Sequence, residues 1–293
     1  MGNKKYAVFT MDVETFSDTD CIRFANIPVD TDLMDGFDEY IKLMDRHGIK
    51  STLFTLGKLA PRIADRLKPC IDRGHKLALH GYDHEPPMSM PVDQFREKSR
   101  LAKNRLESLF NTNVVGYRAP CFSMDKDRLN VLQELGFRYD SSYLDYRKAR
   151  HTVRMDLSDF QQVRGSIFRR KNFYEFGLSK CKMFGANFPI SGGGYVRLCP
   201  WGVVKTLIRQ YIRKNDYYVF YLHPFELTKQ KVPFIRELKS YDKYYIKRGI
   251  RSYSKRIEKT IQMLKKHNYE FVTFEELMQI MENKREVFPA AGD

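Results

Sequence analysis

Side chains able to bind a metal or move protons directly follow four apolar segments of the chain. They are Asp12 and Glu14 after residues 6–11, His80 and His84 after 76–79, Arg118 after 114–117, and His223 after 217–222. Carboxylates and imidazoles bind divalent metals and transfer protons, and a guanidinium can hold a carboxylate. The shared placement predicts one reaction centre built from four segments that lie far apart in the sequence.

The histidine pair indicates a metal site. His80 and His84 have the i, i+4 spacing that places two imidazoles on one face of a turn, as zinc requires. Asp12 and Glu14 are two residues apart, so both point to the same side of an extended strand end. Two imidazoles and one carboxylate make a three-ligand catalytic zinc site, which leaves the second carboxylate free as a base. Taken alone, His80 and His84 fit an ordinary polar loop equally well. The polar residues at the other strand ends favour the metal site.

The elements that must position these residues alternate between apolar runs and helical patterns. Expected strands are 6–11, 51–56, 76–79, 114–117, 217–222, 269–273 and one starting at Phe137; expected helices are 33–47, 60–73, 92–110, 125–135, 201–214, 252–267 and 274–283. This alternation predicts an α/β fold with a parallel sheet built from βαβ units. The carboxyl ends of such strands share one edge, where ligands bind.

One part of the chain departs from that rhythm. Residues 151–200, which contain three consecutive glycines at 192–194, read as an irregular insertion or as hairpins. The glycines do not follow the strand-to-helix pattern of a nucleotide-binding loop. Without a repeat or a linker, residues 1–293 are expected to form a single domain, with a core at about 6–227 and a basic helical segment at about 229–284.

Composition excludes several classes of protein. The 293 residues are 42% hydrophobic and 14% aromatic, which is enough for a sizeable core and excludes a disordered chain. No apolar run is long enough to span a membrane, and the apolar stretch at 6–11 is too short for a secretory signal, so we expect a cytoplasmic protein. Five scattered cysteines without a CxxC pair indicate neither a disulfide framework nor a thiolate zinc site.

Positive charge is concentrated near the C-terminus. The net charge is +15, and residues 229–267 contain thirteen Lys and Arg against three acidic residues. Such a surface attracts polyanions or anionic lipid headgroups, and tyrosines among these cations suit a peripheral contact with the inner face of a membrane. A solvated basic surface is an equally simple interpretation. No helix-turn-helix, zinc-finger or RNA-binding motif is present, so specific nucleic-acid binding is not expected.

Read together, the motifs resemble a known family. The segments TMDVE, HGYDH, RAPCFS, DSS and YLHPFE are similar to those of the polysaccharide deacetylases of carbohydrate esterase family four, the NodB-homology domain. The resemblance runs from residue 6 to about 227, and the TFEEL helix near the C-terminus is also typical. SGGGYVRLCPWG followed by FYLHPFE resembles the branch linked to exopolysaccharide and capsule gene clusters. The resemblance implies a distorted (β/α) barrel and a divalent metal, usually zinc.

The family pattern assigns a role to each remaining polar residue. By resemblance, Asp12 is the catalytic base, Arg118 braces its carboxylate, and His223 is the general acid. Asp140 matches an acid that holds and tunes this histidine, and the backbone N–H of Cys121 matches an oxyanion contact. Cys121 stands where the family commonly has a Tyr, which removes an aromatic wall of the sugar groove, and the fourth motif lacks its usual Trp.

The metal ligands follow the family less closely. His80 and His84 match the two metal-binding histidines. The usual first motif is Thr-Phe-Asp-Asp-Gly, whose second Asp binds the metal, and here Val13 occupies that place. Glu14 is the expected substitute, because some relatives use an Asp-x-Asp arrangement with the ligand two residues further on.

The resemblance implies a metal-dependent hydrolase that removes an N-acetyl group from a sugar residue of a polysaccharide or its lipid-linked precursor. Two alternatives stay open: a deformylase or other amidase acting on a lipid-linked sugar, and a catalytically silent relative that binds carbohydrate or polyanions. Val13 and the basic C-terminal segment favour the silent relative. A nucleophilic role for Cys121 is not favoured, because no His or Asn near it completes a catalytic set.

Overall fold

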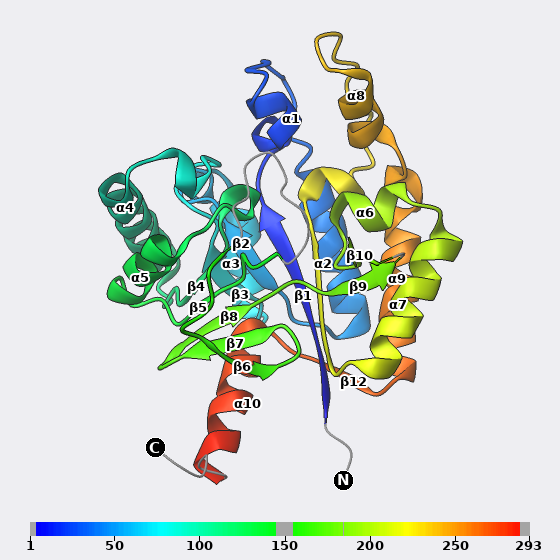
Figure 1. Ribbon diagram of the computed structural model, residues 1–293. Helices are drawn as coiled ribbons and strands as arrows, with labels where there is room; N and C mark the ends of the chain where they lie inside the picture. The colour runs from blue at the N-terminus through cyan, green and yellow to red at the C-terminus, as the bar shows by residue number, and fades with distance from the viewer. Residues whose placement is uncertain (1–3, 145–154, 184, 288–293) are drawn as a thin grey trace.

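The computed structural model describes residues 4–144, 155–183 and 185–287 (Figure 1). Its centre is a ten-stranded sheet in the order β11-β1-β2-β3-β4-β5-β8-β7-β6, with β12 also paired to β1. The strands of this sheet are β1 Lys5–Val13, β2 Thr52–Thr55, β3 Lys76–Leu79, β4 Gly116–Tyr117, β5 Tyr139–Asp140, β6 Gln161–Arg164, β7 Ile167–Arg170, β8 Phe173–Phe176, β11 Tyr217–Leu222 and β12 Tyr269–Phe271.

Parallel pairing dominates the sheet. Strands β11, β1, β2, β3, β4, β5 and β8 pair in parallel in that order, and β12 pairs in parallel with β1. The described strands curl into a half-barrel whose outermost strands, β11 and β6, do not pair with each other. This confirms the predicted α/β fold of distorted-barrel type.

Helices pack around this sheet. They are α1 Asp20–Arg23, α2 Asp35–His47, α3 Ala64–Asp72, α4 Val92–Phe110, α5 Lys126–Glu134, α6 Gly193–Leu198, α7 Trp201–Lys214, α8 Ser240–Lys247, α9 Ile250–Lys266 and α10 Phe274–Val287. Helix α2 shows why they form: Phe37, Tyr40, Ile41 and Met44 are buried at helical spacing, and the helix ends at Gly48, whose φ of 68° is left-handed. In the described part of the chain, no helix is both long and apolar enough to cross a bilayer.

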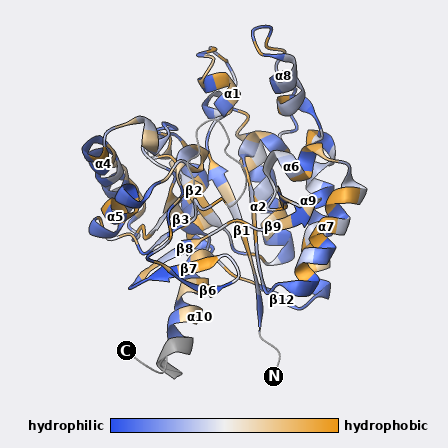
Figure 2. Ribbon diagram, in the orientation of Figure 1, coloured by the Kyte–Doolittle hydropathy of each residue, from blue (hydrophilic) through white to orange (hydrophobic). Residues whose placement is uncertain are grey.

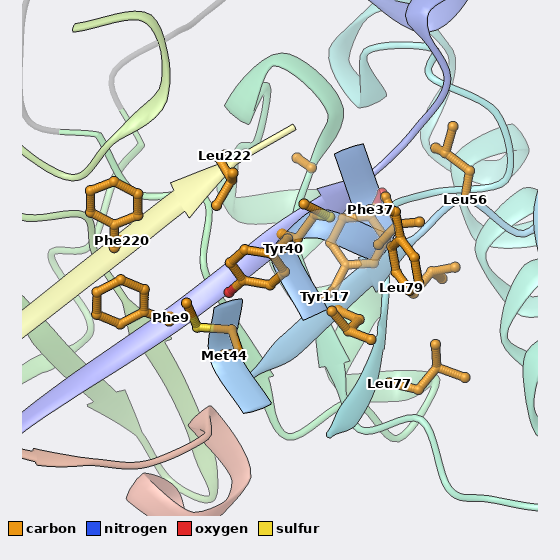
Figure 3. Close-up of a cluster of buried hydrophobic side chains, with 14 of the residues drawn as sticks. Phe9, Phe37, Tyr40, Met44, Leu56, Leu77, Leu79, Tyr117, Phe220 and Leu222 are labelled. Atoms are coloured by element: carbon orange, nitrogen blue, oxygen red, sulfur yellow. The ribbon is translucent and has the colours of Figure 1, made fainter. Parts of the chain in front are cut away.

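The core lies between the sheet and these helices. Figure 3 shows Phe9 and Phe220 from adjacent strands beside Tyr40 and Met44 of α2. The rings of Phe9 and Phe220 stack with their centroids 5.1 Å apart. Figure 2 shows hydrophilic residues along the outward faces of the helices, as expected for elements that bury only one face.

The predicted insertion proves more regular than expected. Strands β6, β7 and β8 form antiparallel pairs that extend the main sheet through β8, and β9 Lys180–Met183 pairs with β10 Ala186–Pro189 in a separate hairpin. Of the two predictions for 151–200, the hairpins are therefore found and the irregular insertion is wrong; residues 151–154 and 184 lie outside the described residues. Strand β6 has no buried residue and β7 has one, so these two segments lack the apolar pattern that would mark them as strands.

Three short helices, α1, α6 and α8, lie outside the predicted helix ranges. Helices α1 and α8 stand above the arrowhead of β1 in Figure 1, where the polar strand ends meet. The three helices are four, six and eight residues long, and therefore too short to give a clear helical period.

Candidate active site

The four polar segments meet in one pocket at the carboxyl end of the sheet. The pocket has a volume of about 640 Å³. The predicted residues in its wall are Asp12, Glu14, His80, His84, Cys121 and His223. Residues of α1 and α8, including Cys21 and Tyr245, form its rim. The parallel sheet brings these segments together because the strands that precede them all end at the same edge.

Glu14, His80 and His84 form a compact set of potential metal ligands. One ligand atom from each lies within 4.8 Å of the others. Glu14 Oε2 is 2.8 Å from Nε2 of His84 and 3.7 Å from Nε2 of His80. The Nδ1 of His80 lies 2.9 Å from the carbonyl oxygen of Arg118, and its buried Nε2 lacks a hydrogen-bond partner among the described residues. An imidazole that donates Nδ1–H to a carbonyl presents a free Nε2 lone pair, so this donor set fits a divalent metal.

Asp12 is held differently. Its Oδ1 accepts a hydrogen bond of 2.7 Å from Nη1 of Arg118, which also donates to Thr10 Oγ1 at 2.8 Å. The remaining guanidinium donors reach the carbonyl and hydroxyl oxygens of Ser141 at 3.1 and 3.0 Å. Arg118 is completely buried, with its guanidinium 4.1 Å from the centroid of the Phe54 ring. The fold thus gives the two carboxylates separate partners, a guanidinium for Asp12 and two imidazoles for Glu14.

His223 stands between these two carboxylates. Its Nε2 lies 3.9 Å from both Asp12 Oδ2 and Glu14 Oε1. Burial alone would lower the pKa of His223, but the charges of Glu14, Glu226 and Asp12 outweigh it and raise the pKa to about 10. A cation bound by Glu14 would offset the negative charge of this carboxylate, and the pKa of His223 would then fall toward the neutral range. His223 can therefore carry a proton in the pocket.

Glu226 is the carboxylate that holds His223, and the sequence analysis missed it. Glu226 Oε2 lies 3.3 Å from Nδ1 of His223 and accepts the backbone N–H of the same residue at 3.1 Å. Its Oε1 accepts a 2.8 Å hydrogen bond from Nε of Arg197, and neither side chain is exposed. Arg197 also donates to the carbonyl of Arg248. The only sequence signal was the i, i+3 spacing of His223 and Glu226, since nothing near Arg197 suggested a role.

The predicted role of Asp140 needs correction. Asp140 Oδ1 accepts a 2.8 Å hydrogen bond from Ser142 Oγ, and Asp140 is the strand partner of Glu175 in the β5–β8 register. Burial raises the pKa of both carboxyls, and the Asp140 charge raises that of Glu175 further. Asp140 therefore belongs to a buried carboxyl pair, and Glu226 takes the place at His223 that was expected for Asp140.

Cys121 lies at the pocket wall in a left-handed conformation, with φ 55°. Its thiol donates to Asp20 Oδ1 at 3.0 Å, and that oxygen also lies 3.7 Å from Nδ1 of His84. Burial and the nearby Asp20 charge raise the pKa of the Cys121 thiol, which argues against a nucleophilic thiolate. Asp20 thus lies near His84 without a hydrogen bond to its Nδ1.

Comparison with protein families gives two matches along the chain. Residues 19–139 match the family "Polysaccharide deacetylase", and residues 141–279 match a "Domain of unknown function (DUF3473)". His80, His84 and Arg118 fall in the first match, and His223 and Glu226 in the second. The main sheet draws strands from both segments, so the pocket needs both.

Individual relatives agree with the first match. Peptidoglycan deacetylase-like protein FGM2 of Gibberella zeae is 34% identical over 109 residues, which cover 36% of this chain and 32% of that protein. The match thus spans about a third of this curated relative.

Solved structures extend the likeness to the whole fold. A Mycobacterium smegmatis protein assigned as a polysaccharide deacetylase has a TM-score of 0.62 at 16% identity, covering 97% of this chain and 93% of that one. A CE4 family pseudoenzyme from Bacillus anthracis has a TM-score of 0.51 at 12% identity, covering 95% and 66%. The fold alone therefore does not establish activity. The comparisons therefore show that residues 19–139 are similar to the polysaccharide deacetylase family, and that the fold of the chain is similar to that of solved polysaccharide deacetylase structures.

Proposed function

We propose that this protein is a metal-dependent hydrolase that removes an N-acetyl group from a sugar residue of a polysaccharide or its lipid-linked precursor. One observation carries the proposal: the ligand set of Glu14, His80 and His84 shares a pocket with Asp12 and His223, which have the chemistry of a base and an acid. The family match supports sugar deacetylation as the reaction.

Glu14, His80 and His84 would hold the metal, most simply Zn²⁺, whose preferred ligands are imidazole and carboxylate. A bound metal supplies Lewis-acid chemistry, because it polarises a carbonyl oxygen and lowers the pKa of water. Glu14 suits this role better than Asp12, because the Asp12 carboxylate is hydrogen-bonded to Arg118.

The proton transfers fall to residues of this chain. Asp12, oriented by Arg118, would accept a proton from the attacking water, and the backbone N–H of Cys121 would donate to the developing oxyanion. An amine leaves poorly unless it is protonated. His223, held at Nδ1 by Glu226, would give its proton to the leaving nitrogen.

Metal content and acetate release from N-acetylglucosamine oligomers test these roles separately. We expect His80→Ala or His84→Ala to lose both metal and activity. Asp12→Asn should keep the metal and lose turnover, whereas Glu14→Gln should lose metal. If Asp12→Asn loses the metal while Glu14→Gln keeps it, ligand and base are exchanged. Full metal content in both histidine variants would show that the site is wrong.

A catalytically silent carbohydrate-binding relative is the second candidate. Val13 in place of the family's metal-binding Asp favours it. A silent protein should lack stoichiometric metal and release no acetate. A deformylase or other amidase, by contrast, should keep the metal and release formate or another acid in place of acetate.

The proposed substrate extends to lipid-linked precursors, and the proposed location is the cytoplasmic face of a membrane, in exopolysaccharide or capsule assembly. Phe234, Tyr241 and Tyr244 are exposed at 71, 70 and 46% around α8, and the ammonium groups of Lys243 and Lys247 lie 5.4 and 4.9 Å from the Phe234 ring. Exposed aromatic rings beside cations suit an interface with anionic lipid, which gives the cytoplasmic leaflet its negative potential.

Liposome co-sedimentation tests the membrane contact. Binding should require anionic lipid, fall with added salt, and weaken when Lys243, Lys247, Arg248 and Arg251 are replaced by Ser. Equal binding to neutral and anionic vesicles, or no binding at low salt, would leave this segment as a solvated basic surface.

A further inference from the structure

A second pocket, of about 660 Å³, lies where the chain passes from α8 into α9. Its wall combines the segment 227–232 with Lys247 at the end of α8 and with residues from the first two turns of α9. None of these residues has a role in the proposed deacetylation. The pocket is therefore a feature separate from the candidate active site.

Cations dominate the wall of this pocket. Lys229, Lys231, Lys247 and Arg251 line it, and Glu39 is the one acidic residue among the described lining residues. Glu39 forms ion pairs with Lys229 and Lys42, at 2.6 and 3.3 Å, so it offsets Lys229 and leaves Lys231, Lys247 and Arg251 unbalanced. Clustered like charges repel each other unless an anion binds between them. The pocket thus carries positive charge that its own acidic residue does not balance.

The start of α9 adds to this imbalance. A helix N-terminus carries partial positive charge, which an acidic residue in the first turn normally offsets. Helix α9 has no acidic residue in its first turn and no side-chain cap on Gly249, and it places Arg251 there. The helix end and the lining cations therefore favour the same partner, a group with concentrated negative charge.

The second pocket is close to the active-site pocket along the chain. The 3₁₀ turn Pro224–Leu227 begins directly after His223 and ends at Leu227, which lines the second pocket. A four-residue 3₁₀ turn spans about 8 Å. The two pockets therefore flank the same buried turn of the chain.

We propose that this pocket binds the phosphate groups of an anionic ligand, with Lys231 and Arg251 as the principal contacts. Two sources share this chemistry: the diphosphate that joins a sugar to a lipid carrier, and the headgroup of an anionic phospholipid. The assignment to a lipid-linked substrate rests on the proposed function, whereas phosphate binding itself does not. Arginine and lysine are the residues that bind phosphate best in proteins.

Calorimetric titration with inorganic pyrophosphate tests the site without reference to activity. The protein should bind pyrophosphate, and the double variant Lys231→Ser/Arg251→Ser should bind it at least tenfold more weakly. A matched control, Arg209→Ser/Lys214→Ser on α7, removes the same charges from exposed positions outside the pocket and should change the Kd less than twofold. Absence of binding, or equal weakening in both double variants, would overturn the proposal.

Vesicle binding then distinguishes the two sources. Because Arg251 also belongs to the membrane contact proposed above, Arg251→Ser alone is the reference in this experiment. If Lys231→Ser/Arg251→Ser binds phosphatidylcholine vesicles containing phosphatidylglycerol markedly more weakly than Arg251→Ser does, while the control keeps binding, the pocket accepts a phospholipid headgroup. If vesicle binding is unchanged but pyrophosphate binding is lost, the ligand is a diphosphate. Acetate release from soluble oligomers should be unchanged in this variant, because neither residue lines the active-site pocket. Failure of phosphate binding is thus distinguishable from failure of the deacetylase proposal.

Discussion

The same sheet buries two pairs of acidic side chains in opposite electrostatic settings. Asp12 and Glu14 are at most 2% exposed, yet a guanidinium and three imidazoles surround them. Asp140 and Glu175 are completely buried, and the partners found for them in the described chain are hydroxyl groups, backbone N–H groups and each other. The neighbours that the fold supplies, rather than burial itself, set the charge of each pair.

The pKa values follow this division. Burial raises the pKa of Glu14, but the charges of His84 and His223 and the hydrogen bonds from the imidazoles hold it well below its ordinary value. Nothing comparable opposes burial at the other pair, so the pKa of Asp140 rises to about 6 and that of Glu175 rises further. The first pair can serve as ligand and base, whereas the second shares protons and joins β5 to β8.

Removal of His223, the proposed proton donor beside Asp12 and Glu14, should have the largest effect on activity. His223→Ala should lower kcat by about 10²–10⁴-fold with little change in KM, because its proton is needed mainly in the transition state. Metal content should be unchanged. Steady-state kinetics provide the measurement, with His267→Ala, a histidine outside the pocket, as control. A change confined to KM would make His223 a substrate contact instead.

Removal of Arg118, the cation that pairs with Asp12, should lower the free energy of unfolding. Arg118→Met leaves Asp12 buried without its partner, and a broken buried pair costs about 3–5 kcal/mol. Urea unfolding measures this cost. The matched control is Arg138→Met, whose ion pair with Glu282 is partly exposed and should contribute less than about 1 kcal/mol. Equal losses in the two variants would contradict the contrast between a buried and an exposed pair.

Glu226→Gln keeps the shape of the contact to His223 but removes its charge. We expect kcat to fall by about 10–100-fold, since a hydrogen bond to a charged group contributes roughly 1.5–3 kcal/mol. Glu226→Asp should recover part of the loss. Thermal unfolding of the same proteins separates this effect from a structural one, because Arg197 also loses its partner. Unchanged kcat in a destabilised Gln variant would limit Glu226 to a structural role.

The smallest effect should come from the pair of Asp140 and Glu175, which changes how the unfolding free energy depends on pH. A carboxyl whose pKa is higher folded than unfolded stabilises the fold most at low pH and loses that contribution as pH rises. The unfolding free energy should therefore fall as pH rises from about 4 through 6 and beyond. Glu175→Gln imitates the protonated acid and should flatten this decline, gaining about 1 kcal/mol or more at pH 8. An unchanged pH profile would show that Glu175 is ionised in the folded protein.

Helices and strands with a clear apolar pattern were predictable from the sequence. The predicted ranges 76–79, 92–110, 201–214 and 217–222 coincide with β3, α4, α7 and β11. Each has a strong apolar period or a continuous buried run that local physics alone can specify. The short strands at 161–176 and helices α1, α6 and α8 have no predicted range, because packing against the rest of the fold is what stabilises them.

It was also predictable that the candidate site residues meet at one edge of the sheet; they are Asp12, Glu14, His80, His84 and His223. Their residue types lie at strand ends, and parallel strands bring such ends to one edge. The family resemblance paired Arg118 with Asp12, as the structure has it, but it assigned the wrong carboxylate to His223. Asp140 and His223 are separated by several strands in the sheet order, whereas Glu226 follows His223 by a single turn.

The sequence by itself determined the elements and the chemical types at their ends, since both depend on residues close together in the chain. The family resemblance had indicated that Arg118 pairs with Asp12, whereas only the tertiary structure decided that Arg197 supports Glu226 and that Asp140 faces Glu175. Partners in each of these pairs lie 29 to 106 residues apart. The relative positions of their strands and helices, rather than local spacing, bring each charge to its partner.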